Sequence, residues 1–178
     1  MKFDQLIRYA LFNNDELVSK IAKTDEGIPL IASVRVPQAK YPLVEYHQVD
    51  GSDSQFADDE IYAERALYQV GVTTRGKEYE ELSELIKQTL RKLDFKIVVT
   101  YLKQNVYTEL NSWYVQARCN LDHSHFEYLY QREKELFDQK HKDWQNKFPD
   151  GKYFVELLND DVSKAQLVEQ LDDNYTVL

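Results

Sequence analysis

The spacing of apolar and polar residues changes along the chain, and each change marks a predicted element. From Phe3 to Leu11, apolar residues recur at helical spacing, which predicts an amphipathic helix. Asn13 and Asn14 interrupt this pattern, and Asp15 is then a suitable N-cap for a short second helix. We therefore expect the chain to begin with two helices.

Strand-forming residues dominate the next part of the chain. Residues 28–36, 42–49 and 61–74 are rich in β-branched and aromatic residues, so we predict a strand in each. Residues 50–60, DGSDSQFADDE, are polar, acidic and longer than a hairpin turn needs, which predicts a long loop that contacts another protein. The candidate contact residues are Asp50, Ser52, Asp53, Ser54, Gln55, Phe56, Asp58 and Asp59.

Helical spacing returns at residues 79–93, and two further strands are predicted at 97–102 and 112–121. In the last strand, Trp113 and Val115 begin an alternation of apolar and polar residues, so one face of the strand lies on a core. The resulting order over residues 1–121 is α-β-β-β-α-β-β. It predicts an α+β fold in which a largely antiparallel sheet of about four to five strands packs against two helices on one face.

Residues 122–178 have a different character and form a predicted helical C-terminal extension. An aromatic stripe runs at helical spacing until the helix ends before Pro149. The stripe packs either on the subunit's own sheet or on a neighbouring protomer, and we favour the neighbour because two helices already cover the sheet. The candidate residues of this intersubunit arm are Phe126, Tyr130, Phe137, Trp144 and Phe148.

Charge and cysteine content narrow the classes of function. The 178 residues include 22 basic and 31 acidic side chains, and the net charge of -9 has the wrong sign for gripping a nucleic-acid backbone. Cys119 is the single cysteine, so the chain forms no intramolecular disulfide and suits a reducing compartment. We expect neither a membrane-spanning segment nor a signal peptide, because no long apolar run or basic-then-apolar N-terminus is present.

One cluster resembles a metal-ligand set, since Asp122, His123 and His125 bring a carboxylate and two imidazoles close together in sequence. It lies where a strand passes into a helix, a place at which Asp122 or Ser124 serves as a helix N-cap. We favour capping. The sequence has no nucleotide-binding glycine motif and none of the common hydrolase or metalloprotease motifs. We therefore predict no catalytic residue, cofactor site or metal site.

Two other reactive groups have simpler structural explanations. Cys119 near His123 resembles a thiol beside a base, but it shares the apolar face of its strand, which predicts a buried cysteine. Asp58, Asp59 and Glu60 are adjacent acids that cannot converge from one extended segment, so they predict a solvated acidic surface.

The chain contains 13 tyrosines, many of them in or near predicted strands. Tyrosine is favoured both in amphipathic strands and at protein interfaces. Composition alone does not separate these two roles, and both stay open.

Several local strings together resemble one protein family. They are Gly-Ile-Pro at 27–29, VPQAKYPLVEYHQVDGS at 36–52, the helix at 78–93 and VYTELNSWYVQARCNL at 106–121. With the order of elements over residues 1–121, they resemble the tail terminator, or tail completion, proteins of long-tailed bacteriophages. None of these strings is a catalytic motif.

The resemblance implies a non-enzymatic virion protein, made in the host cytoplasm, that forms a hexameric ring at the head–tail joint. Such a ring caps the tail tube protein and docks to the head connector, and genomic DNA passes through it without specific binding. Residues 122–178 depart from the shortest members of the family. Two other classes stay open: a cytosolic interaction module that binds a partner through its aromatic C-terminal helix, and a metal-dependent hydrolase using His123 and His125.

Overall fold

The helices and strands follow one another in an order close to that predicted. The computed structural model describes residues 3–25, 27–33, 40–57 and 60–141. Along the chain, the elements are α1 (Phe3–Asn13), α2 (Asp15–Lys20), β1 (Ile31–Ala32), β2 (Leu43–Ala57), β3 (Glu60–Thr74), α3 (Tyr79–Lys92), β4 (Lys96–Asn105), β5 (Leu110–Asp122) and α4 (His123–Lys140).

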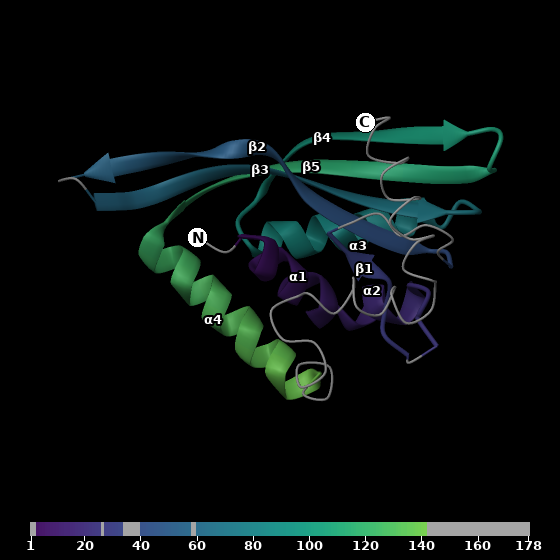
Figure 1. The fold of residues 1–178 in the computed structure, drawn as a ribbon, viewed down its shortest axis with the longest axis horizontal. Helices are drawn as coiled ribbons and strands as arrows, with labels where there is room; N and C mark the ends of the chain where they lie inside the picture. Colours follow the sequence, from purple (N-terminus) through teal and green to yellow (C-terminus); the bar gives the residue numbers. More distant parts are fainter. Residues whose placement is uncertain (1–2, 26, 34–39, 58–59, 142–178) are drawn as a thin grey trace, which may run out of the picture.

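The strands form one five-stranded sheet with the order β1-β2-β3-β5-β4. The pairs β2–β3, β3–β5 and β5–β4 are antiparallel, whereas the short β1 runs parallel to β2. Among the described residues, the helices gather on one side of the sheet and none of them lies on its other face, called the uncovered face below (Figure 1). The predicted α+β class with a largely antiparallel sheet is therefore confirmed.

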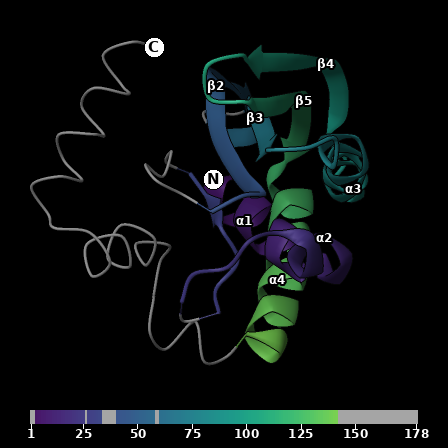
Figure 2. The same ribbon diagram turned by 90° about the vertical axis from the view of Figure 1, so that its right-hand side faces the viewer.

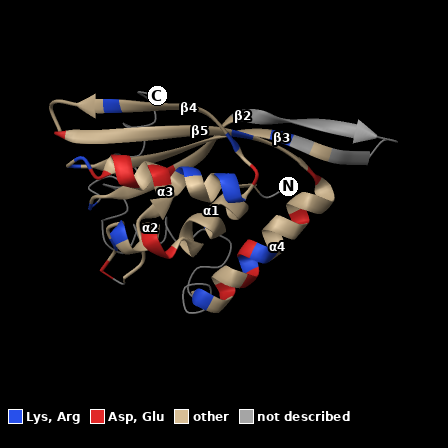
Figure 3. Ribbon diagram, turned by 180° about the vertical axis from the view of Figure 1, so that it is seen from behind, with Lys and Arg blue, Asp and Glu red and all other residues tan. Residues whose placement is uncertain are grey.

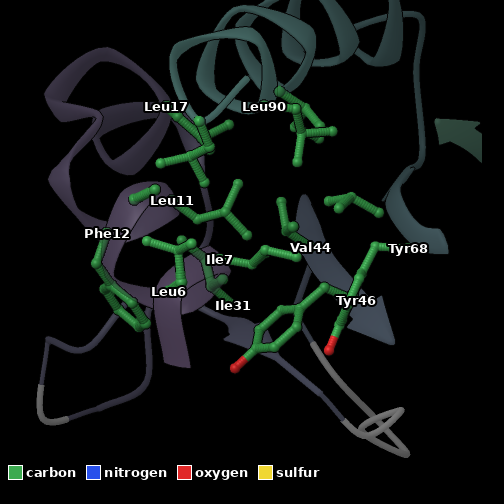
Figure 4. Packing of buried hydrophobic residues seen from close by; sticks show 14 of the residues in the cluster. Leu6, Ile7, Leu11, Phe12, Leu17, Ile31, Val44, Tyr46, Tyr68 and Leu90 are labelled. Carbon is green, nitrogen blue, oxygen red and sulfur yellow. The ribbon is translucent and has the colours of Figure 1, made fainter. Parts of the chain in front are cut away.

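The core lies between the sheet and the helices. Alternation along β5 places Val115, Ala117 and Cys119 on the helix side, where each is at most 2% exposed. Figure 4 shows Leu6, Ile7 and Leu11 of α1 among side chains from β2 and β3. Leu90 of α3 closes the same core.

Helix α1 is buried on more than one side because it lies between the sheet and α4 (Figures 1 and 2). The rings of Tyr9 and Phe137 have centroids 5.0 Å apart, and those of Phe3 and Phe126 are 4.9 Å apart. Tyr130 is half-buried and its hydroxyl donates a hydrogen bond to Gln5 Oε1. Helix α4 thus packs on its own subunit.

The interpretation of Phe126, Tyr130 and Phe137 as an intersubunit arm is wrong. That interpretation assumed that two helices are enough to cover one face of the sheet. It did not take into account that α1 has a second apolar side, which α4 covers. Trp144 and Phe148, the other two candidates, lie outside the described residues.

The interpretation of residues 50–60 as a long loop is also wrong, because β2 continues to Ala57 and β3 begins at Glu60. The register between them shifts at three places, one of them between Asp50 and Asp53. Bulges therefore absorb the residues that suggested a loop. Asp58 and Asp59 lie outside the described residues, and the contact role of residues 50–56 stays a prediction.

Two local details near the N-terminus differ from expectation. The N-cap of α2 is Asn14 rather than Asp15, since the Asn14 side chain accepts a hydrogen bond from the Leu17 N–H at 3.0 Å. Of the strand predicted over 28–36, the described residues contain only Ile31–Ala32 as β1. The parallel pairing of β1 with β2 is too short to leave a clear alternation in the sequence.

Candidate functional site

Strand β4 forms one edge of the sheet and is the most exposed strand in the described part of the chain. It pairs with β5, and none of its ten residues is buried. Its sequence, KIVVTYLKQN, is nevertheless apolar through the middle. An apolar edge strand offers unpaired backbone groups and side chains to another chain.

Exposed apolar side chains gather on this strand and its turn. Among the described residues, nine large apolar side chains are exposed, and six of them belong to the hairpin that joins β4 to β5. These six are Val98 (52% exposed), Val99 (43%), Tyr101 (40%), Leu102 (36%), Val106 (80%) and Tyr107 (95%). Such a concentration is typical of a protein-interaction site.

Side-chain hydrogen bonds support the turn of this hairpin. Asn105 Oδ1 accepts hydrogen bonds from the backbone N–H groups of Tyr107, at 3.0 Å, and Thr108, at 3.3 Å. Glu109 adopts a positive φ of 57°, which turns the chain into β5. Val106 and Tyr107 therefore lie on a turn that hydrogen bonds to Asn105 stabilise, which lowers the entropy that a partner's binding would cost.

The uncovered face of the sheet continues the same surface. Tyr101 stacks on Tyr114 with ring centroids 5.0 Å apart, and the Tyr101 hydroxyl donates to Gln69 Oε1 at 3.0 Å. Gln116 Nε2 donates to the same oxygen at 2.9 Å. A side chain at Gly71 would lie 2.8 Å from the Tyr114 ring, so glycine permits this packing. Ordered aromatic and amide groups of this kind suit contact with a protein.

The tyrosines divide between the two roles that the sequence left open. Tyr46 and Tyr68 are buried, and burial raises the pKa of both phenols. Tyr101 and Tyr107 are exposed on the β4–β5 hairpin. The core therefore accounts for some of the tyrosines, and others lie on the uncovered surface.

The predicted capping role of Asp122 is confirmed. Its carboxylate accepts hydrogen bonds from Ser124 Oγ at 2.7 Å and from the His125 backbone N–H at 2.8 Å. These two bonds, the Ser124 bond first, lower the pKa of Asp122 below its ordinary value. His125 turns toward Asp94, with Nε2 2.6 Å from Oδ2. Within residues 3–25, 27–33, 40–57 and 60–141, no three His, Cys, Asp or Glu side chains are grouped to hold a metal ion.

Cys119 is buried on the helix side of β5, as its position in the alternation predicted. The side chains of Asp58, Asp59 and Glu60 are outside the described part of the structure, so the prediction of a solvated acidic surface is untested.

A pocket of about 320 Å³ with both polar and apolar lining residues lies between α1, α3 and α4, and the sequence analysis missed it. Buried Asn13 donates through Nδ2 to both the backbone carbonyl and Oε2 of Glu133, each at 2.8 Å. Arg132 donates to Glu133 Oε1 and to the Lys92 carbonyl. The sequence feature that could have indicated this pocket is Glu133, an acidic residue within the apolar stripe of α4. The pocket's polar groups serve to join the three helices.

The β4–β5 hairpin also escaped the sequence analysis as a candidate site. The sequence feature that could have indicated it is the mostly apolar run at 97–102, followed after three polar residues by Val106 and Tyr107. Figure 3 shows few charged residues on β4 and β5, in contrast to the mixed charges along α3 and α4.

No family model and no curated protein matches this chain. In the part of the chain that the structure describes, none of the helices combines the length and apolar character needed to cross a membrane.

Proposed function

We propose that this chain is a non-enzymatic structural subunit that assembles with copies of itself into a ring at the head–tail joint of a long-tailed bacteriophage. The ring caps the tail tube and meets the head connector. The observation that carries the proposal is the β4–β5 hairpin, an ordered sheet edge that exposes six large apolar side chains. A subunit built to associate needs such a surface.

The family resemblance supports the specific location. In the described residues, its strings lie just before β1, on the first part of β2, on α3, and on β5 with the turn that precedes it, which are parts of one α+β fold. The net charge of -9 also suits a ring through which a polyanion must slide without being held.

Two observations favour this proposal over the two competing classes. The interaction module required an exposed aromatic helix, but α4 buries Phe126, Leu129 and Phe137 on its own subunit. The hydrolase required His123 and His125 with a carboxylate, but Asp122 caps α4 and His125 contacts Asp94.

The proposal is tested by imaging the purified protein and by an assay of head–tail joining. We expect the purified protein to form annuli in negative-stain images, and to restore the joining of heads to tails assembled without it. Tyr107→Ser with Val106→Ser should abolish both results without lowering the thermal midpoint. Tyr128→Ser is the matched control, because Tyr128 is 62% exposed on α4 and lies outside the hairpin. A wild-type protein that stays monomeric and does not complete tails would contradict the proposal.

A further inference from the structure

The sheet has a second open edge besides β4. Strand β1 pairs with β2 at Val44 and Glu45. From Val49 to Ala57, β2 has no outer neighbour among the described residues, and Val49 itself is 45% exposed. This segment, residues 49–57, is called the β2 edge below. Its length is similar to that of β4, which has ten residues.

The directions of the strands make the two edges compatible. Neighbouring strands alternate in direction from β2 through β3 and β5 to β4, because all three pairings are antiparallel. Strand β4 therefore runs opposite to β2. Strand β4 pairs with residues 110–118 of β5, whereas the β2 edge pairs with residues 60–67 of β3, so the two edges lie toward opposite ends of the sheet. A second copy that lies beside the first and is shifted along the strand direction therefore brings β4 of one copy against the β2 edge of the next in antiparallel orientation, the arrangement with the more stable ladder.

The charges of the two edges are also complementary. Strand β4 contains Lys96 and Lys103 and no acidic residue, whereas the β2 edge contains Asp50 and Asp53 and no lysine or arginine. Pairing β4 with a second β4 would bring lysines together, and pairing two β2 edges would bring aspartates together. Like charges across a strand pair are destabilising, so the unlike pairing is favoured.

Each edge also offers an apolar contact near its charges. Val98 and Val49 lie at register shifts in β4 and β2, and both are about half exposed. The lysines of β4 lie toward its two ends, so its apolar middle carries none of the charged residues that normally protect an edge.

We propose that the occupant of β4 is the β2 edge of a second copy of this chain, paired antiparallel so that one sheet continues into the next. The contact is heterologous, because each copy uses β4 to contact one neighbour and the β2 edge to contact the other. Repetition of such a contact produces a closed ring when the rotation between copies closes. This inference rests on the self-assembly in the proposed function and adds which surfaces join.

A charge exchange between two variants tests the pairing. The first variant is Val49→Lys with Asp53→Lys. It gives the β2 edge a net positive charge, the sign that β4 carries in the wild type. The second variant is Val98→Asp with Lys103→Asp. It gives β4 a net negative charge, the sign that the β2 edge carries in the wild type. Each variant alone should associate at least about tenfold more weakly than wild type. A 1:1 mixture should regain the wild-type mass, because every contact between unlike variants is again complementary.

Two control variants carry uncharged residues at the same positions. They are Val49→Thr with Asp53→Asn, and Val98→Thr with Lys103→Gln. Their association should be much closer to that of wild type than the association of either charged variant. Circular dichroism and the thermal midpoint show that each variant is folded. Full association of either charged variant alone, or a mixture that stays dissociated, overturns the pairing while leaving the proposed ring intact. A wild-type protein that never associates contradicts the proposed function itself.

Discussion

Two regions of this molecule use the same kinds of residue in opposite ways. Between α1 and α4, aromatic side chains are buried within one chain, and Phe137 is 3% exposed. On the β4–β5 hairpin, valine, leucine and tyrosine are left in solvent, and Tyr107 is 95% exposed. The first set stabilises the subunit, and the second is available to stabilise an assembly. Apolar composition alone does not tell these roles apart, whereas their place in the fold does.

The largest expected effect on folding lies in the helical region. Phe137→Ala should lower the free energy of unfolding by about 3 to 5 kcal/mol, since it removes a buried ring that contacts Tyr9 and Phe12. Urea denaturation monitored by circular dichroism measures the loss. Tyr107→Ala is the comparison on the hairpin and should leave the unfolding midpoint unchanged. Equal losses in the two variants would mean that the regions do not differ as described.

A smaller loss is expected from the polar contacts between α1 and α4. Asn13→Ala should cost about 2 kcal/mol of unfolding free energy, because Glu133 loses the amide that donates to its carbonyl and carboxylate. Gln131→Ala, on the exposed side of α4, is the control. A midpoint for the Asn13 variant equal to that of the control would show that this network adds nothing.

The smallest effect on folding concerns the start of α4. The pKa of Asp122 is lowered from 3.8 by hydrogen bonds from Ser124 and the His125 N–H. Its stabilisation is therefore fully present above the unfolded pKa and is lost as the pH falls through the lowered folded pKa. Asp122→Ala should reduce the thermal midpoint at neutral pH, and the difference from wild type should shrink in acid. A difference that grows on acidification would contradict the capping account.

Several elements could be predicted from the sequence because their signals are local. The helix Tyr79–Lys92 and the strand Leu110–Asp122 each carry a clear apolar period, and both were expected within a few residues. The cap at Asp122 followed from its place between a strand and a helix. These features depend on residues a few positions apart, so no knowledge of strand order is needed.

The features that were predicted wrongly from the sequence depend on contacts between segments that are distant in the chain. Residues 50–57 resemble a loop in composition, but pairing with β3 holds them in a strand with bulges. The stripe of α4 resembles a surface for a partner, but α1 covers it. The exposure of β4 depends on its place at the end of the order β1-β2-β3-β5-β4, which no local pattern encodes.

The most direct test of the account is amide hydrogen exchange of the wild-type chain, measured in the assembled and dissociated states. A new antiparallel neighbour occupies the outward-facing N–H groups of β4, which slows their exchange. We expect assembly to slow exchange in Lys96–Asn105 and in residues 49–57, with α1 and α4 unchanged. If the exchange of β4 is the same in both states while another surface becomes protected, the hairpin is not the assembly surface and the central claim is wrong.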